Sequence, residues 1–317
     1  MKAVFLDLDS LDKQDLNLQE LKGAVDSFCC YDLTLPDQVE TRIADAEVVI
    51  VNKVVLNETV LRSATRLRLI CIAATGTNNV DLEAAAELGI QVTNCQGYGT
   101  ASVAQHVFSL MLALHTNLLA YNRSARNGDW EKSTQFCLLD YPIQELCGKT
   151  LGIIGYGTLG REVGRLAEAF GMNLLVAQRP GGRPEAGRLP LSDVLNQADV
   201  LSLHCPLTEV TRNLIDEAEL GQMKSGSFLI NAARGGIVNE SALADALRAG
   251  HLAGAATDVL TVEPPTADNP LLAEDIPNLI ITPHSAWGSV EARQRIVDQL
   301  TGSIFGFKAG NTERRIV

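Results

Sequence analysis

Two side chains suited to anion binding or proton transfer follow apolar, β-branched runs of the sequence. Arg234 comes after the run Ser227–Asn231, and His284 comes after the run Leu279–Thr282. Open sheets of parallel strands bind ligands at the carboxyl ends of their strands. A guanidinium offers a planar fork of donors that holds both oxygens of a carboxylate, and an imidazole exchanges protons near neutral pH. A lone arginine or histidine is more often structural, but these positions favour a site for a small carboxylic acid.

A glycine-rich segment lies between a predicted buried strand, Leu151–Ile154, and a predicted helix, Arg161–Phe170. The first glycine allows a tight turn, the second lets a pyrophosphate approach the backbone, and the third lets the helix pack closely on the strand. The N-terminus of the helix then presents N–H groups and a partial positive charge to the phosphates. Framed in this way, the segment predicts a dinucleotide site. Its six residues are Gly155, Tyr156, Gly157, Thr158, Leu159 and Gly160.

The residue expected to select between NAD and NADP is not acidic. In such sites an acidic residue about 20 positions after the glycines binds the ribose hydroxyls of NAD. Here Gln178 takes that place, and Arg179 follows it. One hypothesis is that NADPH is accepted or preferred, because no carboxylate repels its 2′-phosphate and a guanidinium attracts it. The alternative is that Gln178 bonds the ribose hydroxyls and Arg179 stays in solvent, so that NADH serves. The cofactor is thus predicted as NAD(P)H, with the preference open.

Short β-branched runs alternate with amphipathic stretches along almost the whole chain. Such alternation predicts an α/β fold with parallel sheets and helices on both faces. The predicted strands are Val48–Val51, Leu69–Ala73, Gln91–Asn94, Leu151–Ile154, Leu174–Val176, Val200–His204, Ser227–Asn231, Ala253–Asp258 and Leu279–Thr282. The amphipathic helices include Asp81–Leu88, Arg161–Phe170 and Ser241–Ala249, which are followed or ended by glycine as helix C-termini prefer.

The strongest breaks in this alternation are Gly97–Gly99 and the proline-rich segment Glu263–Pro270. They predict a first α/β unit that ends near residue 97 and a second that ends near residue 285. A helix over Ser289–Phe307 has apolar residues at helical spacing and is expected to return to the first unit. The expected domains are therefore 1–97 with 286–317, and 98–285 for the dinucleotide. A long apolar helix is predicted over Thr100–Tyr121.

Composition excludes several classes of protein. The chain has 317 residues, of which 46% are hydrophobic and 20% charged, with a formal net charge of −12. It can therefore bury a sizeable core, whereas a basic surface for nucleic acid is not expected. The apolar stretch Val107–Tyr121 is too short and polar for a membrane span. Asp7 and Asp9 break the apolar run at the N-terminus, which predicts a strand there and not a signal peptide. Seven cysteines without a CxxC pair predict no metal site and no disulfides. We expect a cytoplasmic protein with no membrane or nucleic-acid partner.

Six further segments carry a distinctive pattern: Ala74–Asp81, Ala101–His106, His204–Leu207, Asn231–Gly236, Thr257–Pro265 and Thr282–Trp287. The last three contain Arg234, Glu263 and His284, and this order of arginine, glutamate and histidine at these spacings is quite specific. The segments resemble motifs of the D-isomer-specific 2-hydroxyacid dehydrogenase family, and the resemblance covers essentially the whole chain. Within the family, Thr282–Trp287 and Val51–Lys53 look most like the glycerate dehydrogenase (hydroxypyruvate reductase) branch.

The resemblance implies a doubly wound Rossmann cofactor domain and a smaller flavodoxin-like substrate domain. It implies hydride transfer between NAD(P)H and a small 2-keto acid, with hydroxypyruvate and glyoxylate as the expected substrates and D-glycerate and glycolate as products. Arg234 would hold the carboxylate of the substrate. His284 would donate the proton in reduction and accept it in oxidation. Glu263 would pair with His284 and favour its imidazolium form.

Further contacts follow from the same resemblance. Asp258 would help to place the nicotinamide carboxamide. The backbone of Ala74, Thr75 and Gly76 would bind the substrate carboxylate, although an ordinary tight turn explains this segment equally well. Trp287 would cap a small substrate cavity. The other predicted cofactor contacts are Cys205, Pro206, Ala232, Arg234 and His284.

Three alternatives remain open. The helix predicted over Thr100–Tyr121 lies at a dimer interface in this family, so a homodimer is expected, but it could instead form the core between domains. The chain could be an NAD-binding sensor or corepressor without catalysis, against which the joint presence of Arg234, Glu263 and His284 argues. It could also oxidise another small anion such as formate, which Arg234 would equally hold.

Overall fold

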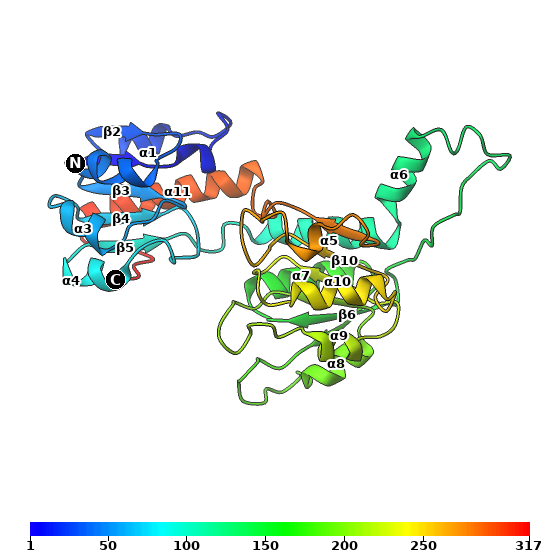
Figure 1. Cartoon of the computed structure of the whole chain (residues 1–317). Coiled ribbons are helices and arrows are strands. Elements are labelled where there is room, and N and C mark those ends of the chain that lie inside the picture. The colour runs from blue at the N-terminus through cyan, green and yellow to red at the C-terminus, as the bar shows by residue number, and fades with distance from the viewer. The chain divides into compact units, whose positions relative to one another are not determined.

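All 317 residues are described by the computed structural model, and their strands lie in two separate sheets (Figure 1). The chain divides into unit 1, Met1–Gly99 with Trp287–Val317, and unit 2, Thr100–Ala286. Every strand pair in both sheets is parallel. This confirms the predicted fold class of two parallel-sheet α/β domains.

The sheet of unit 1 has the strand order β2-β1-β3-β4-β5. Successive side chains of β3 pack in two apolar clusters, one on each face of the sheet, because successive side chains of a strand point to opposite faces. Val48 and Ile50 pack with α1 and α11, whereas Val49 and Val51 pack with α2, α3 and α4. The elements of unit 1 are β1 (Lys2–Phe5), η1 (Leu8–Ser10), α1 (Gln19–Gly23), β2 (Ser27–Cys30), η2 (Pro36–Gln38), α2 (Val39–Ile43), β3 (Val48–Val51), α3 (Glu58–Ser63), β4 (Leu69–Ile72), α4 (Leu82–Glu87), β5 (Gln91–Asn94) and α11 (Val290–Lys308).

The C-terminal helix α11 packs against β4 and α1, so the chain returns to unit 1 after unit 2 is complete. Ser289 caps the helix by accepting a hydrogen bond from Ala292 N. Its buried face enters the cluster that also contains Phe5 and Leu69. The residues of that face are Ile296, Val297, Leu300 and Ile304.

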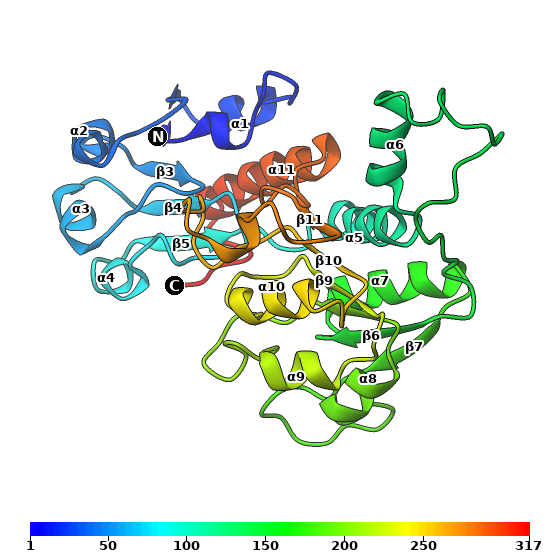
Figure 2. The same ribbon diagram turned by 45° about the vertical axis from the view of Figure 1, so that its right-hand side comes forward.

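The sheet of unit 2 has the strand order β11-β10-β9-β8-β6-β7. Helices α8, α9 and α10 bury apolar side chains in one cluster, and α5 packs against α7 and against β9 and β10 (Figure 2). The elements of unit 2 are α5 (Thr100–His115), α6 (Leu118–Arg126), β6 (Thr150–Ile154), α7 (Thr158–Ala169), β7 (Asn173–Val176), α8 (Leu191–Gln197), β8 (Val200–Leu203), α9 (Glu217–Gln222), β9 (Phe228–Asn231), α10 (Glu240–Arg248), β10 (Gly254–Thr257), η3 (Pro270–Leu272) and β11 (Leu279–Ile281).

The single helix predicted over Thr100–Tyr121 is wrong. Two helices, α5 and α6, meet there at an angle of 60°. Asn117 lies between them with a φ of 49°, a left-handed conformation that a right-handed helix cannot contain. Its side chain donates to Pro142 O instead of to solvent, which favours the break. No single helix is long and apolar enough to cross a membrane. The bent pair α5–α6 reaches the required length and apolar composition only when its two helices are taken together.

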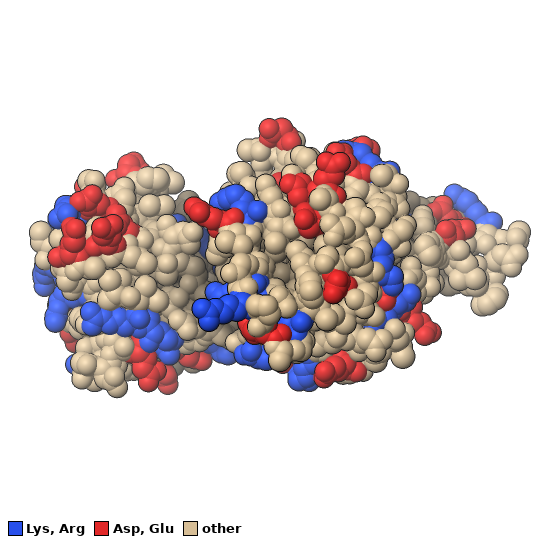
Figure 3. All heavy atoms as spheres, turned by 90° about the horizontal axis from the view of Figure 1, so that it is seen from below, with Lys and Arg blue, Asp and Glu red and all other residues tan.

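Charged side chains of both signs are mixed over the face shown in Figure 3. Some charged side chains of the chain form pairs along surface helices, such as Arg165 with the partly exposed Glu162 in α7 and Arg62 with Glu58 in α3. Exposed pairs of this kind contribute little to stability. The stability of both units therefore comes mainly from the apolar clusters on the faces of the sheets.

Candidate active site

In unit 2 the strand order reverses beside β6, because β7 lies on one side of it and β8 on the other. The loops that follow β6 and β8 border the crevice where open α/β sheets bind ligands. Gly155 follows β6 with a φ of 93°, and a Cβ there would lie 2.5 Å from Cys205 N. Glycine at position 155 therefore lets the two loops touch, backbone against backbone.

The start of α7 fits the pyrophosphate of a dinucleotide. A Cβ at Gly160 would lie 2.2 Å from Gly155 O, so only glycine lets the helix begin so close to the strand. A Cβ at Gly157 would meet nothing within 4 Å, and no side chain caps the helix. The open side of Gly157 and the uncapped N–H groups of the first turn are the features that hold phosphates at helix N-termini.

The corresponding position of unit 1 is closed by a side chain. Asp7 follows β1 and is 4% exposed. Its carboxylate accepts hydrogen bonds from the N–H groups of Asn52, Lys53 and Val54 at 2.9, 2.6 and 3.2 Å. These N–H groups already have an anionic partner. The geometry therefore favours unit 2 as the unit that binds the dinucleotide.

The loop after β7 carries the two residues expected to select the cofactor. Gln178 N donates to Leu189 O at 2.8 Å, which ties this end of the strand to the return of the loop. Arg179 is exposed, and its carbonyl accepts a hydrogen bond from Gly182 N at 2.8 Å. Gly181 completes this turn with a φ of 68°. Arg179 thus stands at the start of an ordered turn with its guanidinium in solvent.

Uncharged residues follow β8 at the crevice. Burial raises the pKa of the Cys205 thiol to about 11, so this side chain is a neutral thiol at pH 7. Pro206 O accepts the hydroxyl of Thr211 at 2.7 Å, which holds the loop in place. Burial lowers the pKa of His204 to about 4, so its ring is neutral as well. Attraction for phosphates at this crevice therefore comes from the start of α7 and not from these side chains.

The low pKa of His204 predicts a loss of stability in mild acid. The unfolded chain takes up a proton near 6.5 and the folded chain only near 4, so the free energy of unfolding falls as the pH drops from 6.5 to 4. Between pH 7 and pH 5 this contribution is about 2 kcal/mol. Urea unfolding at both pH values should show a smaller decrease for His204→Asn than for the wild type. Equal decreases in the two proteins would contradict the assignment to His204.

Arg234 stands in a turn that Asn231 holds at the end of β9. Asn231 Nδ2 donates to Arg234 O at 3.0 Å, and Asn231 Oδ1 accepts from Ala233 N at 3.1 Å. Ala232 and Ala233 are buried, whereas Arg234 is exposed. One guanidinium nitrogen, Nη1, donates to Ala233 O at 2.7 Å, and the remaining N–H groups have no protein partner. They can therefore hold an anion such as a carboxylate.

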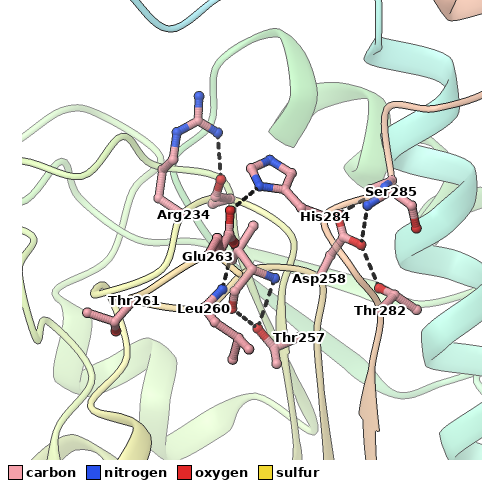
Figure 4. Close-up of polar contacts among 12 residues, drawn as sticks. Arg234, Thr257, Asp258, Leu260, Thr261, Glu263, Thr282, His284 and Ser285 are labelled. Atoms are coloured by element: carbon pink, nitrogen blue, oxygen red, sulfur yellow. Dashed lines mark hydrogen bonds and ion pairs between the residues drawn. The ribbon is translucent and has the colours of Figure 1, made fainter. Parts of the chain in front are cut away.

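His284 and Glu263 form an acid–base pair beside Arg234 (Figure 4). The distance from His284 Nδ1 to Glu263 Oε2 is 2.6 Å, and both side chains are about one-third exposed. Glu263 Oε1 also accepts a hydrogen bond from Leu260 N at 2.8 Å, which orients the carboxylate. With Nδ1 engaged by Glu263, Nε2 is the ring nitrogen of His284 that stays available for proton transfer. Such a pair can deliver a proton to a developing alkoxide.

His284 adopts an unusual backbone conformation, with a φ of 52°. Its own N–H donates to Asp258 O at 2.8 Å. The carboxylate of Asp258 accepts hydrogen bonds from the hydroxyl of Thr282 at 2.6 Å and from Ser285 N and Ala286 N, each at 2.9 Å. Asp258, which is 1% exposed, therefore holds the turn on both sides of His284.

Some residues of this arrangement were missed from the sequence. The sequence assigned His106, on α5, no role in the site, but its Nε2 lies 2.9 Å from Thr282 Oγ1 and 3.5 Å from Asp258 Oδ1. Thr282 and Asn231 stand two and three positions before predicted site residues, so their motifs carried a signal for them. His106 is far from both of its partners in the sequence, and only tertiary structure brings it to them.

The remaining predicted substrate contacts, Ala74–Gly76 and Trp287, belong to unit 1. Their role in substrate binding stays a prediction. The loop Ala74–Gly76 follows β4. Asn94 Nδ2 donates to Thr75 O at 2.8 Å, and the hydroxyl of Thr75 donates to Cys95 O at 2.9 Å. Trp287 packs edge to face on Tyr98, with 6.3 Å between the ring centroids. The structure thus gives the loop two hydrogen-bonded anchors and Trp287 an aromatic contact.

Known proteins are similar to this chain over nearly its whole length. Residues 108–286 match the family model of the D-isomer specific 2-hydroxyacid dehydrogenase, NAD binding domain. A putative 2-hydroxyacid dehydrogenase of Haemophilus influenzae is 45% identical, over 97% of this chain and 98% of that protein. A glycerate dehydrogenase of Methylorubrum extorquens is 43% identical, over 98% of each chain.

A solved structure extends the comparison to the whole fold. An acyclic imino acid reductase in complex with NADPH and D-Arg is 26% identical, covers 100% of both chains and superposes with a TM-score of 0.86. The residues matched to the NAD-binding domain lie within unit 2, which also contains the glycine-rich segment and the pair His284–Glu263. The chain therefore belongs to the D-isomer specific 2-hydroxyacid dehydrogenase family and is an NAD(P)-dependent oxidoreductase.

Proposed function

We propose that this enzyme reduces hydroxypyruvate to D-glycerate and glyoxylate to glycolate. The observation that carries the proposal is the His284–Glu263 pair at 2.6 Å beside the guanidinium of Arg234, of which only Nη1 has a protein partner. The relative named glycerate dehydrogenase, 43% identical over 98% of each chain, supports this substrate class. Oxidation of glycerate at C2 yields hydroxypyruvate. A glycerate dehydrogenase and a hydroxypyruvate reductase therefore catalyse the same reaction in opposite directions.

We assign the chemical roles as follows. Arg234 binds the substrate carboxylate through its free N–H groups, which also orients the carbonyl. His284 donates a proton from Nε2 to the carbonyl oxygen during reduction, while Glu263 stabilises the imidazolium form. The nicotinamide cofactor, when bound, supplies the hydride. Residues Gly155–Gly160 and Asp258 are proposed to hold that cofactor, and Ala74–Gly76 and Trp287 the substrate.

We propose that NADPH is accepted alongside NADH. The support is the absence of a carboxylate at Gln178 and the exposed guanidinium of Arg179 at an ordered turn. Gln178→Asp should lower kcat/KM for NADPH about 10-fold or more, because its carboxylate would repel the 2′-phosphate, while NADH use is retained. Parallel measurements with the two cofactors check this. A Gln178→Asp enzyme that uses NADPH as well as the wild type would contradict the proposal.

The substrate proposal is tested by the decrease in absorbance of the reduced nicotinamide with purified protein. Hydroxypyruvate and glyoxylate should be reduced fastest, pyruvate more slowly, and branched or aromatic keto acids poorly. Formate with the oxidised cofactor serves as the control for the alternative anion. Rates for an aromatic keto acid equal to those for hydroxypyruvate would contradict the proposed substrates, although not the reaction class.

We propose further that the enzyme is a cytoplasmic homodimer joined through the arm, defined as residues 118–143. In Figures 1 and 2, α6 and the loop after it project from the rest of unit 2. The arm exposes large apolar side chains, among them Phe136 at 89%. A second copy that packs on the arm would remove them from water. A monomer in analytical ultracentrifugation would contradict the dimer. The proposed cytoplasmic location is supported by the seven cysteines, none of which forms a disulfide.

A further inference from the structure

The loop between β10 and η3 must hold Glu263 against His284, yet it has little packing of its own. Residues 261–268 are all exposed, so no apolar cluster fixes the loop. One close contact stands at its start: a Cβ at Gly235 would lie 1.9 Å from Leu260 O. The turn of Arg234 and the start of this loop therefore touch, backbone against backbone. The rest of the loop needs polar anchors.

Glu240 supplies those anchors at both ends of the loop. It is the first residue of α10, directly after the N-cap Asn239. Its Oε1 accepts a hydrogen bond from Thr261 N at 2.6 Å, and its Oε2 accepts one from Asn269 Nδ2 at 2.8 Å. Asn269 in turn accepts from Leu271 N at 2.9 Å, which joins the far end of the loop to η3. Both carboxylate oxygens are thus committed to the loop that carries Glu263.

Two carboxylates share the start of this loop. Leu260 N donates to Glu263 Oε1, and the next N–H group, that of Thr261, donates to Glu240 Oε1. Because the two donors are consecutive, movement of Thr261 also displaces Leu260 and the carboxylate of Glu263. A shift of this kind would change the contact between Glu263 Oε2 and His284 Nδ1.

We propose that Glu240 is a positioning residue that fixes Glu263 against His284. The proposal rests on the roles assigned above to Glu263 and His284. Glu240 is hydrogen-bonded to the two ends of the loop and not to either of these residues, so it acts through the loop. The charged or titratable side chains around the ring of His284 and its turn are Glu263, Arg234, Asp258 and, through Thr282, His106. Replacement of Glu240 removes none of these side chains and alters only the support of the loop that carries Glu263.

The test compares Glu240→Ala and Glu240→Gln with Glu263→Gln and with Glu217→Ala as the matched control. Glu217 is likewise the first residue of a helix, α9, after the N-cap Asp216, but its side chain is exposed and contacts no loop of the site. It corrects for the loss of a negative charge at a helix N-terminus. The amide of Glu240→Gln keeps an acceptor for Thr261 N but presents an N–H group to Asn269 Nδ2, so this variant should restore part of the function.

We expect Glu240→Ala to lower kcat/KM for keto-acid reduction about 10-fold, since a small misplacement of a catalytic group costs that much or more. The pH at which the rate is half-maximal should move in the same direction as in Glu263→Gln, by a smaller amount. The dissociation constant for NADH should stay unchanged, and Glu217→Ala should behave as the wild type. Hydrogen exchange of residues 259–269, measured without cofactor or substrate, should be faster in Glu240→Ala only.

The outcomes separate this inference from the function on which it rests. If the Glu263→Gln enzyme has the same pH profile as the wild type, the assigned role of Glu263 fails. If Glu263→Gln shifts the profile but Glu240→Ala does not, the inference about Glu240 is overturned and the proposed function stands. A Glu240→Ala enzyme that loses only thermal stability, with an unaltered profile, would likewise show a merely structural role.

Discussion

Replacement of His284 by alanine is expected to lower kcat for reduction of a 2-keto acid by about 10³-fold, because the developing alkoxide then lacks its proton donor. The partner of His284 in the structure is Glu263, at 2.6 Å, so the remaining carboxylate cannot deliver a proton from the same position. Binding of NADH should persist, since the glycine-rich segment after β6 is unaffected. Steady-state kinetics and a fluorescence titration with NADH measure the two effects separately.

His251→Asn is the matched control for this change. His251 is half-buried in unit 2, where its Nε2 lies 3.0 Å from Met223 O, away from the residues of the site. The His251→Asn enzyme should keep nearly the wild-type kcat for keto-acid reduction. A His284→Ala enzyme that retained more than about a tenth of the wild-type kcat across the pH range would refute the assignment of the proton donor.

Replacement of Arg234 by glutamine is expected to lower kcat/KM for the keto acid by about 10²- to 10³-fold, the usual cost of removing one partner of a desolvated charge pair. Most of the change should lie in KM, since the guanidinium binds the carboxylate before and during the reaction. Arg234→Lys should be intermediate, because an ammonium keeps the charge but not the planar fork of donors. Kinetics with hydroxypyruvate at several concentrations give both parameters.

Arg248→Gln controls for the loss of a positive charge in unit 2. Arg248 lies at the end of α10, where it pairs with Asp275 and Asp245 on the surface. Its replacement should leave KM unchanged at moderate ionic strength, since exposed charges are screened over about 10 Å. An unchanged KM in Arg234→Gln would show that another group binds the carboxylate, and the loop Ala74–Gly76 would be the next to test.

Local patterns account for much of the fold. Runs of apolar, β-branched residues identified nine strands, whose observed bounds differ by one residue or less at each end. Glycines at 89, 171 and 250 have φ values of 69–71° at or just after helix ends, as the sequence predicted. The edge strand β2 was not predicted, because Ser27–Cys30 is partly exposed and lacks the continuous apolar run of a central strand. Asn117 ended a helix that hydropathy alone would have continued.

The sequence by itself determined which side chains stand at the carboxyl ends of β9 and β11, since strand bounds and motif spacing are local properties of the chain. It also determined the glycine spacing before α7, where any Cβ at position 155 or 160 would collide with the backbone. Only the tertiary structure decided which distant residues hold the site in place. Asp258 and His106 meet at Thr282, and Glu240 meets Thr261 and Asn269, through hydrogen bonds between residues 21 to 176 positions apart. Such contacts leave no periodic pattern in the sequence, because they arise from the packing of separate elements and not from the repeat of one.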